Sequence, residues 1–550
     1  MDTTPQGLIS LNERYRADAS GFQNLWRECG KMCLTRKLTG LLNSTSQSTT
    51  HDTGYQPETR LLNSVAVEAN NVLAAGCMTW IMPSEGRWFV WKPAPEQEGN
   101  DALENWLQSC TEIALTMLFS SNFYTRAHEV LLDRSTFGTA SLWAETGIRN
   151  PLNFRAWDVG TFVIGENAEG YVDTVFREIE RTASQAVEEF PQVPPAVTNA
   201  MAANRPNEKF RFLHVIYPRP VKDQSPDGGP MGMPWASVWV HIDSKLKVKE
   251  SGYEELPSFT TRYLRWSEAS AYGVSPAMQA LAEIRGVNYL EMLMATLAEV
   301  TVNPRLILPQ GYQGVPDLRA GGITMGGLDQ SSFPKEWMTG GRFDIGVNLI
   351  ERKEKAINEA FHRTLFEIFS NNIKDINIPH VRALEAEKLA RFSPAFTSLT
   401  TEFINPILER VFMLLYRSGR LPRPPREAFV MNSLGQPTLL FPRAVQNNRM
   451  SLAMQQAKMS GTARIFELFS MVAQAEQTGS ATFDHFDSVR AFRDLTRGEG
   501  LPADYLRSEE SVQAIQEARA QAAQAAEQKE MMMESMKSKP LVEEVIKRAA

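Results

Sequence analysis

The stretch that decides the fold lies at residues 272–302, which read YGVSPAMQALAEIRGVNYLEMLMATLAEVTV. Ser275 and Pro276 form a helix start, because a serine side chain can cap the first turn and proline at the first helical position needs no amide donor. Apolar residues then recur at steps of three and four: Leu281, Ile284, Val287, Leu290, Met294 and Leu297. This spacing predicts one long helix over 276–302.

A second apolar line follows another side of this predicted helix: Met278, Ala282, Tyr289 and Met292. A helix that is apolar on more than one side requires neighbours on several faces. A second long helix is predicted over 347–370, because Ile350, Ile357 and Phe361 share one face and charged residues occupy the other. The pattern alone also fits an antiparallel helical hairpin in an all-α domain.

The segment between the two predicted helices, Asn303–Gly346, contains glycine pairs at 321–322, 326–327 and 340–341. Short apolar runs such as Leu306–Leu308 stand between the glycines. Two or three strands with tight turns are therefore predicted in this segment.

The first 271 residues mix predicted helices with predicted strands. Amphipathic spacing predicts helices over 10–36, 60–81, 102–133 and 182–190. Alternating runs rich in aromatic and β-branched residues predict strands at 88–91, at 139–145, within 154–179, and at 210–217, 236–242 and 260–266. The fold class is therefore α+β.

The chain after residue 370 is predicted to be mostly helical. The predicted elements are a short polar loop at Asn371–Pro379, helices over 381–392 and 397–418, a strand pair around 428–441 and a helix over 444–477. Pro406 is expected to kink or notch the second of these helices. From Ser508 the sequence is rich in Ala, Gln, Glu, Lys and Met, which favours a solvated helix or a partly disordered tail.

The composition is typical of a globular chain with two to four domains: 550 residues, 43% apolar and 22% charged, with a formal net charge of −7. No stretch of 18 uninterrupted apolar residues occurs, so no membrane span is predicted. The first residues lack a basic and an apolar signal segment, so we expect no secretion. The acidic balance argues against a tight DNA-binding surface, because phosphate neutralisation requires a basic excess.

The search for catalytic and metal-binding patterns yields only weak candidates. No phosphate-binding G-x-x-x-x-G-K-[ST] loop occurs, and the seven histidines are scattered. Gly273–Ala277 superficially resembles a nucleophile elbow, but the proline after Ser275 favours a helix cap. Cys29 and Cys33 stand one helical turn apart and could share a metal ion, whereas isolated core thiols are the simpler interpretation. Asp484–Asp487 could ligate a cation or cap a helix. We therefore expect no catalysis, no cofactor and no metal.

Several motifs in the same order and spacing carry a family resemblance. They are YGVSPA at 272–277, NPRLILP at 303–309, ALEAEKLAR at 383–391, LTTEFINPILERVF at 399–412 and GRLP at 419–422. With them the chain resembles the head-to-tail connector (portal) proteins of short-tailed, podovirus-type bacteriophages. The similarity extends from about Leu11 to Ala522.

The resemblance implies a portal-protein fold with an α+β wing, a two-helix stem, a small α/β clip and a helical crown. The implied parts are the wing at 1–271, stem helix 1 at 272–302, the clip at 303–346, stem helix 2 at 347–370, the channel loop at 371–380, wing and channel-lining elements at 381–442, and the crown and tail at 443–550.

The resemblance further implies a homo-oligomeric ring of twelve subunits at one capsid vertex of the virion, assembled in the host cytoplasm. Double-stranded DNA would pass through it during packaging and ejection, and an acidic lumen would let the duplex slide. Its other implied partners are the terminase large subunit, tail adaptor proteins, and capsid and scaffolding proteins. No association with a membrane is implied.

Two sets of residues follow from this assignment. The channel loop would present Asn371, Asn372, Lys374, Asp375 and Asn377 to DNA. The clip would present Arg319, Asp329, Lys335, Glu336 and Arg342 to the motor and adaptors. Two alternatives stay open from the sequence: a capsid-internal structural protein, and a nucleic-acid-processing enzyme with an unrecognised site.

Overall fold

The computed structural model describes residues 2–34, 61–94, 97, 100–147, 150–225, 229–265, 267–268, 270–302, 305–308, 310, 335–337, 343–370, 378–431, 437–439 and 441–452. The chain divides into two compact units, Met1–Met454 and Gln455–Ala550. All described residues belong to the first unit. None of the helices formed by these residues is both long and apolar enough to cross a membrane.

Four long helices lie in the first part of the chain: α1 (Pro5–Cys33), α3 (Val65–Ile81), α4 (Asp101–Ser120) and α5 (Phe123–Phe137). Side chains cap the N-termini of α1 and α4. The Thr4 side chain accepts a hydrogen bond from the Gly7 amide at 3.1 Å, and the Asn100 side chain accepts one from the Leu103 amide at 3.3 Å. The predicted single helix over 102–133 is wrong. Ser121 and Asn122 separate α4 from α5, and the Ser121 hydroxyl accepts the Phe123 amide at 3.1 Å.

Two antiparallel sheets follow. The three-stranded sheet has the order β3-β2-β9, and the five-stranded sheet has the order β4-β5-β6-β7-β8. The strands are β2 (Thr139–Glu145), β3 (Asn153–Trp157), β4 (Phe162–Glu166), β5 (Val172–Thr182), β6 (Lys209–Pro218), β7 (Trp235–His241), β8 (Leu246–Tyr253) and β9 (Ser258–Arg262). The predicted strands at 139–145, 210–217 and 236–242 are confirmed, whereas β8 was not predicted.

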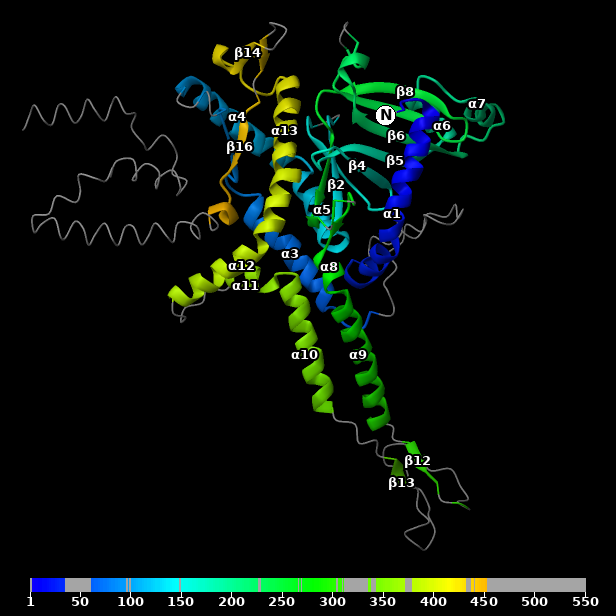
Figure 1. Cartoon of the computed structure of the whole chain (residues 1–550), viewed down its shortest axis with the longest axis vertical. Helices are drawn as coiled ribbons and strands as arrows, with labels where there is room; N and C mark the ends of the chain where they lie inside the picture. Colours follow the sequence, from blue (N-terminus) through cyan, green and yellow to red (C-terminus); the bar gives the residue numbers. More distant parts are fainter. Residues whose placement is uncertain are drawn as a thin grey trace, which may run out of the picture. The chain divides into compact units, whose positions relative to one another are not determined.

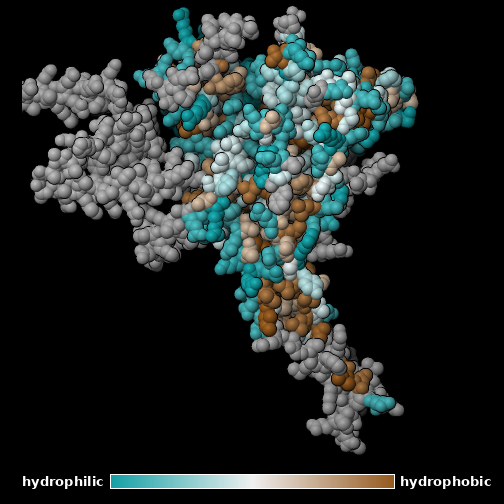
Figure 2. Space-filling model, in the orientation of Figure 1, coloured by the Kyte–Doolittle hydropathy of each residue, from teal (hydrophilic) through white to brown (hydrophobic). Residues whose placement is uncertain are grey.

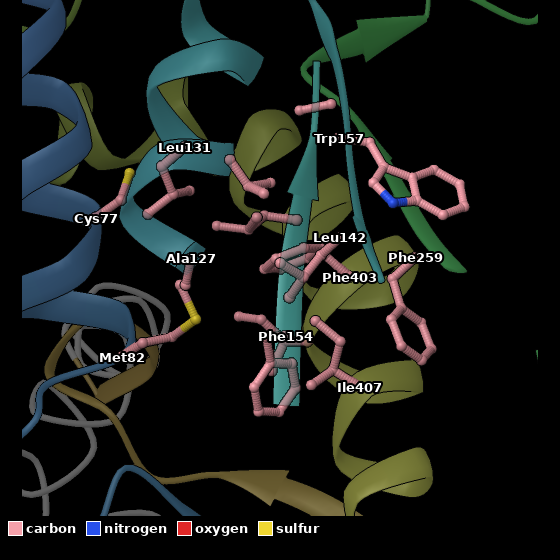
Figure 3. Packing of buried hydrophobic residues seen from close by; sticks show 14 of the residues in the cluster. Cys77, Met82, Ala127, Leu131, Leu142, Phe154, Trp157, Phe259, Phe403 and Ile407 are labelled. Carbon is pink, nitrogen blue, oxygen red and sulfur yellow. The ribbon is translucent and has the colours of Figure 1, made fainter. Parts of the chain in front are cut away.

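One hydrophobic core joins these helices and sheets. Leu142 of the central strand β2 is fully buried, and Figure 3 shows it among side chains from α5 and from the later helical segment that contains Phe403 and Ile407. Cys77 and Met82 approach the same core from the side of α3. A second, smaller core forms where α6 (Ala183–Glu189) and α7 (Pro195–Ala202) pack on β6 and β8.

The second half of the unit is built from helices, with short strand pairs between them. The helices are α8 (Pro276–Gln279), α9 (Leu281–Val302), α10 (Phe343–Ala360), α11 (Arg363–Ser370), α12 (Ile378–Leu399) and α13 (Asn405–Arg417), and the π-helical turn η5 (Thr400–Ile404) joins the last two. The strand pairs are β1 (Phe89–Lys92) with β16 (Arg443–Gln446), β10 (Leu264–Arg265) with β11 (Gly273–Val274), β12 (Arg305–Ile307) with β13 (Lys335–Trp337), and β14 (Phe429–Met431) with β15 (Pro437–Leu439).

Four sequence predictions for this half need correction. The single helix predicted over 276–302 is divided at Ala280 into α8 and α9. The helix predicted over 347–370 is broken, because His362 adopts a positive φ of 54° and ends α10. The two helices predicted on either side of residues 393–396 are continuous, with Pro394 inside α12. The segment predicted to start a helix at Ala444 instead begins in β16, which pairs with the buried strand β1.

Candidate functional site

The start of the first long helix is fixed to the protein body as the sequence predicted. The buried Ser275 hydroxyl accepts a hydrogen bond from the Met278 amide at 3.0 Å and donates one to the Thr136 carbonyl at 2.8 Å. Pro276 occupies the first helical position. The helix-cap interpretation is therefore confirmed, and the hydroxyl that would serve a nucleophile elbow is used in the cap.

The base of α9 is anchored by packing and by one buried amide. The buried residues of α9 all lie in its first third; they are Leu281, Ile284, Val287 and Asn288. The Asn288 amide oxygen accepts the backbone amides of Leu62 and Asn63 at 2.9 and 3.2 Å. The Asn63 side chain in turn donates to Glu354 of α10 at 2.8 Å. The base of the two helices is thus tied to the segment before α3.

Helices α9 and α10 lie side by side (Figure 1) and approach each other closely at a glycine. A Cβ atom on Gly346 of α10 would meet the Met294 sulfur of α9 at 2.2 Å. Nearer the base, Lys353 of α10 forms a 2.6 Å ion pair with Glu283 of α9. The two helices therefore form an antiparallel hairpin, defined here as the stem hairpin.

The outer side of α9 exposes apolar side chains, interspersed with the exposed Thr296 and Glu299. Tyr289, Met292 and Leu293 are 57%, 47% and 43% exposed. Because 3.6 residues complete a helical turn, Tyr289 and Met292 lie on the side opposite Met294, which faces α10. This face matches the second apolar line that the sequence placed on the helix.

Helix α10 exposes apolar side chains on both of its flanks. Gly346 and Ile350 face α9, and neighbouring residues on a helix are about 100° apart. Ile345 and Leu349 therefore lie on one flank, and Phe343 and Val347 on the other, all exposed. Figure 2 shows hydrophobic residues gathered over α9 and α10 on the face in view. The sequence analysis missed the exposed side chains of α10, although their i,i+4 spacing was visible.

The strands predicted between the two helices are partly described. The pair β12–β13 is antiparallel, with Leu306 opposite Glu336 and Ile307 opposite Lys335. Lys335 and Glu336 of the predicted clip set therefore lie in a strand. Arg319, Asp329 and Arg342 lie outside the described residues.

The predicted channel-loop residues, Asn371, Asn372, Lys374, Asp375 and Asn377, all lie outside the described residues. The helices on either side of them are described. The ring of Phe392 in α12 contacts the rings of Phe366 and His362, with centroids 5.7 and 5.3 Å apart. Burial first, and then the charge of Arg391, lower the pKa of His362 to about 4, so this imidazole is neutral at pH 7.

Helix α12 and turn η5 are clamped to the sheets by two buried arginines. Arg134 of α5 donates to the Ala395 carbonyl at 2.6 Å, and burial lowers the pKa of its guanidinium. Arg262 of β9, whose side chain is 4% exposed, pairs with Glu402 of η5 and with Glu166 of β4. Pro406 explains the π-helical turn, because its ring would clash with the Glu402 carbonyl in a regular helix. The clamp was not predicted, since it joins residues far apart in sequence.

The described residues contain no group of three or more His, Cys, Asp or Glu side chains placed to hold a metal ion. Cys29 and Cys33 are buried, and burial raises the pKa of the Cys29 thiol to about 12. A thiol in this environment stays protonated and is a poor metal ligand. Asp484–Asp487 lies outside the described residues.

An α+β body that carries an uncovered apolar helical hairpin is the architecture of an assembly subunit rather than of a self-contained monomer. The model of the bacteriophage head to tail connecting protein family matches residues 6–506, so the chain belongs to that family.

Two curated relatives and one solved structure are similar to this chain. The probable portal protein of Bordetella phage BPP-1 is 25% identical over 440 residues, covering 76% of this chain and 76% of that protein. The portal protein of Salmonella phage epsilon15 is 22% identical over 533 residues, covering 94% and 92%. A chain from the neck of an empty GTA particle computed with C6 symmetry matches at 13% identity and a TM-score of 0.36, covering 80% of this chain and 90% of that chain.

Proposed function

We propose that this chain is a portal subunit, which closes into a ring at one capsid vertex and forms the passage for viral DNA during packaging and ejection. The observation that carries the proposal is the uncovered apolar surface of the stem hairpin. Fully burying one large apolar side chain contributes about 1.5–3 kcal/mol. A row of them on each copy supplies a strong drive for association.

The placement of this surface favours a ring over a simple dimer. A two-fold dimer needs one self-complementary patch, whereas a cyclic assembly needs two different patches that meet head to tail. The outer face of α9, with Tyr289 and Met292, and the flanks of α10, with Ile345 and Leu349, are separate patches. Each copy would thus cover the α9 face of one neighbour with an α10 flank. Twelve subunits is the number implied by the family resemblance.

The parts of the chain take the roles of the portal fold. The stem is 272–302 with 347–370, the clip is 303–346, the channel loop is 371–380, and the wing and crown are the regions before and after. The clip residues Arg319, Asp329, Lys335, Glu336 and Arg342 would face the terminase large subunit and later the tail adaptors. Capsid and scaffolding proteins would surround the ring.

The channel loop would narrow the passage through which DNA moves. Lys374 is its basic residue and Asp375 its acidic one, so a ring of copies would present one circle of each charge. Each lysine near a phosphate adds a salt-dependent attraction equivalent to about one released counterion. The role of the chain is structural, and the chemistry of packaging belongs to the motor. The relatives are named as portal proteins, which supports a virion component at the head–tail junction.

Negative-stain images of the purified chain test the proposal. Closed rings with a central channel are expected, and ATP and DNA should not be turned over by the purified protein. A field of single particles of monomer size, or an enzymatic turnover of either substrate, would contradict it.

A further inference from the structure

One flank of the stem hairpin is acidic. Glu351 and Glu354 of α10 lie on the flank that also exposes Val347, because residues three, four and seven apart share one side of a helix. Glu291 of α9 lies on the same side of the hairpin, since the Asn63 side chain donates to Glu291 at 3.2 Å and to Glu354 at 2.8 Å. None of these three carboxylates, defined here as the acidic group, forms an ion pair with any residue that the structure describes.

The opposite flank of α10 carries one arginine on an apolar surface. Arg352 is exposed beside the exposed Leu349, and it forms no ion pair within the described part of the chain. The neighbouring Lys353 instead faces α9, where it pairs with Glu283 at 2.6 Å. Glu359, the next charged residue on the Arg352 flank, lies seven residues and therefore about 10 Å nearer the base of the hairpin.

Arg352 and the acidic group lie at the same level of the hairpin. Along α10, Arg352 is one residue from Glu351 and two from Glu354, which is a rise of about 1.5–3 Å. Glu291 lies at this level as well, because it shares the Asn63 amide with Glu354. A cyclic rotation leaves the height along the ring axis unchanged. With the hairpin along that axis, the arginine flank of one copy meets the acidic group of the next at matching height.

We propose that Arg352 binds the acidic group of a neighbouring copy, an inference that rests on the proposed ring and names a contact within it. Glu351 is the exposed member of the group, and the guanidinium fork matches its carboxylate. Leu349 beside the arginine and Val347 beside the acids would exclude water from the pair and strengthen it. The pairing also sets the direction of assembly. Unlike flanks attract head to tail, whereas a two-fold dimer would place like flanks together.

Charge reversal in the full-length chain tests this contact. Arg352→Glu and Glu351→Arg each place like charges on opposing flanks, so their rings should dissociate at a lower urea concentration than wild-type rings. The combined variant exchanges the two charges and keeps the formal net charge of −7. Its midpoint should return close to the wild-type value, because the opposed flanks again attract. Sedimentation velocity across a urea series measures all four midpoints.

Lys355→Glu is the matched control. It makes the same change of charge as Arg352→Glu on the same helix, but Lys355 lies on the side of α10 opposite Gly346 and belongs to neither flank. Its midpoint should equal that of wild type. The inference is overturned if either single reversal leaves the midpoint unchanged, if the combined variant does not recover it, or if Lys355→Glu lowers it equally. These outcomes in rings leave the portal assignment standing, whereas a wild-type chain that forms no ring defeats the proposed function itself.

Discussion

Two helical regions of this unit differ in how far they bury their apolar side chains. Helix α12 and turn η5 are held by Arg134 and Arg262, and their apolar side chains, such as Phe392 and Phe403, are fully buried within the same chain. The described residues anchor the stem hairpin at its base, and farther along it exposes Tyr289, Met292 and Leu349. The first region is buried within one chain, and in the proposed ring the second is covered by other subunits.

This difference separates a region that is stabilised by contacts within one chain, α12 with η5, from a region that we propose is stabilised by assembly, the stem hairpin. The Arg134 hydrogen bond to Ala395 holds α12, and the Arg262 pairs with Glu402 and Glu166 hold η5, within a single chain. In the proposed ring, the apolar faces of the hairpin are stabilised by neighbouring copies. Substitutions in the two regions should therefore separate folding from assembly.

The largest effect is expected at the clamp. Arg262→Ala would leave Glu402 without its buried partner, which typically costs about 3–5 kcal/mol, whereas Glu166 would keep its 2.7 Å pair with Arg265. Urea unfolding at fixed protein concentration should show this loss. Arg391→Ala is the control, because its pair with Glu387 is exposed and such pairs contribute about 0–1 kcal/mol. Equal stability losses in the two variants would contradict the account of the clamp.

The next effect concerns assembly alone. Met292→Asp combined with Leu349→Asp should convert rings to monomers, because each interface loses two apolar side chains and gains two charges. The unfolding free energy of the monomer should stay within about 0.5 kcal/mol, as is usual for surface positions. Lys355→Asp, on the exposed charged side of α10, serves as control and should leave rings intact. Sedimentation velocity measures the oligomeric state of the double variant and of the control. Rings that survive the double substitution would contradict an interface between the α9 face and an α10 flank.

A smaller effect is expected where the two hairpin helices touch. Gly346→Ala would place a Cβ 2.2 Å from the Met294 sulfur, so the end of this flexible side chain must move. Moving it costs about 0.5–1.5 kcal/mol, which should cancel the gain of about 0.5–1 kcal/mol from replacing a helical glycine. Gly21→Ala in α1 meets open space and should show that gain in full. Thermal unfolding compares the two variants, and a Gly346→Ala that stabilises as much as Gly21→Ala would contradict the close contact.

The smallest effect is a dependence on pH near the break between α10 and α11. Burial depresses the pKa of His362 from 6.5 to about 4 in the folded chain, so the unfolded chain binds more protons between these values. Stability should therefore fall as pH drops from about 6.5 toward 4. His362→Asn, which tolerates the positive φ of this position, should flatten that part of the profile. A wild-type profile that is unchanged by the substitution would contradict this assignment.

Much of the local structure was predictable because local rules govern it. Ser275 and Pro276 form a helix-start signal from adjacent residues, and the composition of residues 139–145 indicates β2 without reference to other strands. The apolar line through Tyr289 and Met292 also predicted a face that needs neighbours. These features depend on residues close together in sequence.

The errors arose where distant contacts overrule local preference. Pro394 should interrupt a helix, yet Arg134 binds the Ala395 carbonyl and packing of α12 on the core holds the helix continuous. The break at His362 is favoured by burial of Phe361 and by the contact with Phe392, neither of which is evident from spacing.

The central claim is that the uncovered faces of the stem hairpin close a ring of identical subunits. Mass photometry of the purified chain, followed through serial dilution, tests it most directly. The account predicts a single large species whose mass is a fixed integer multiple of 61.7 kDa and persists on dilution. A stable species of 61.7 kDa at micromolar concentration, soluble and folded, would contradict it.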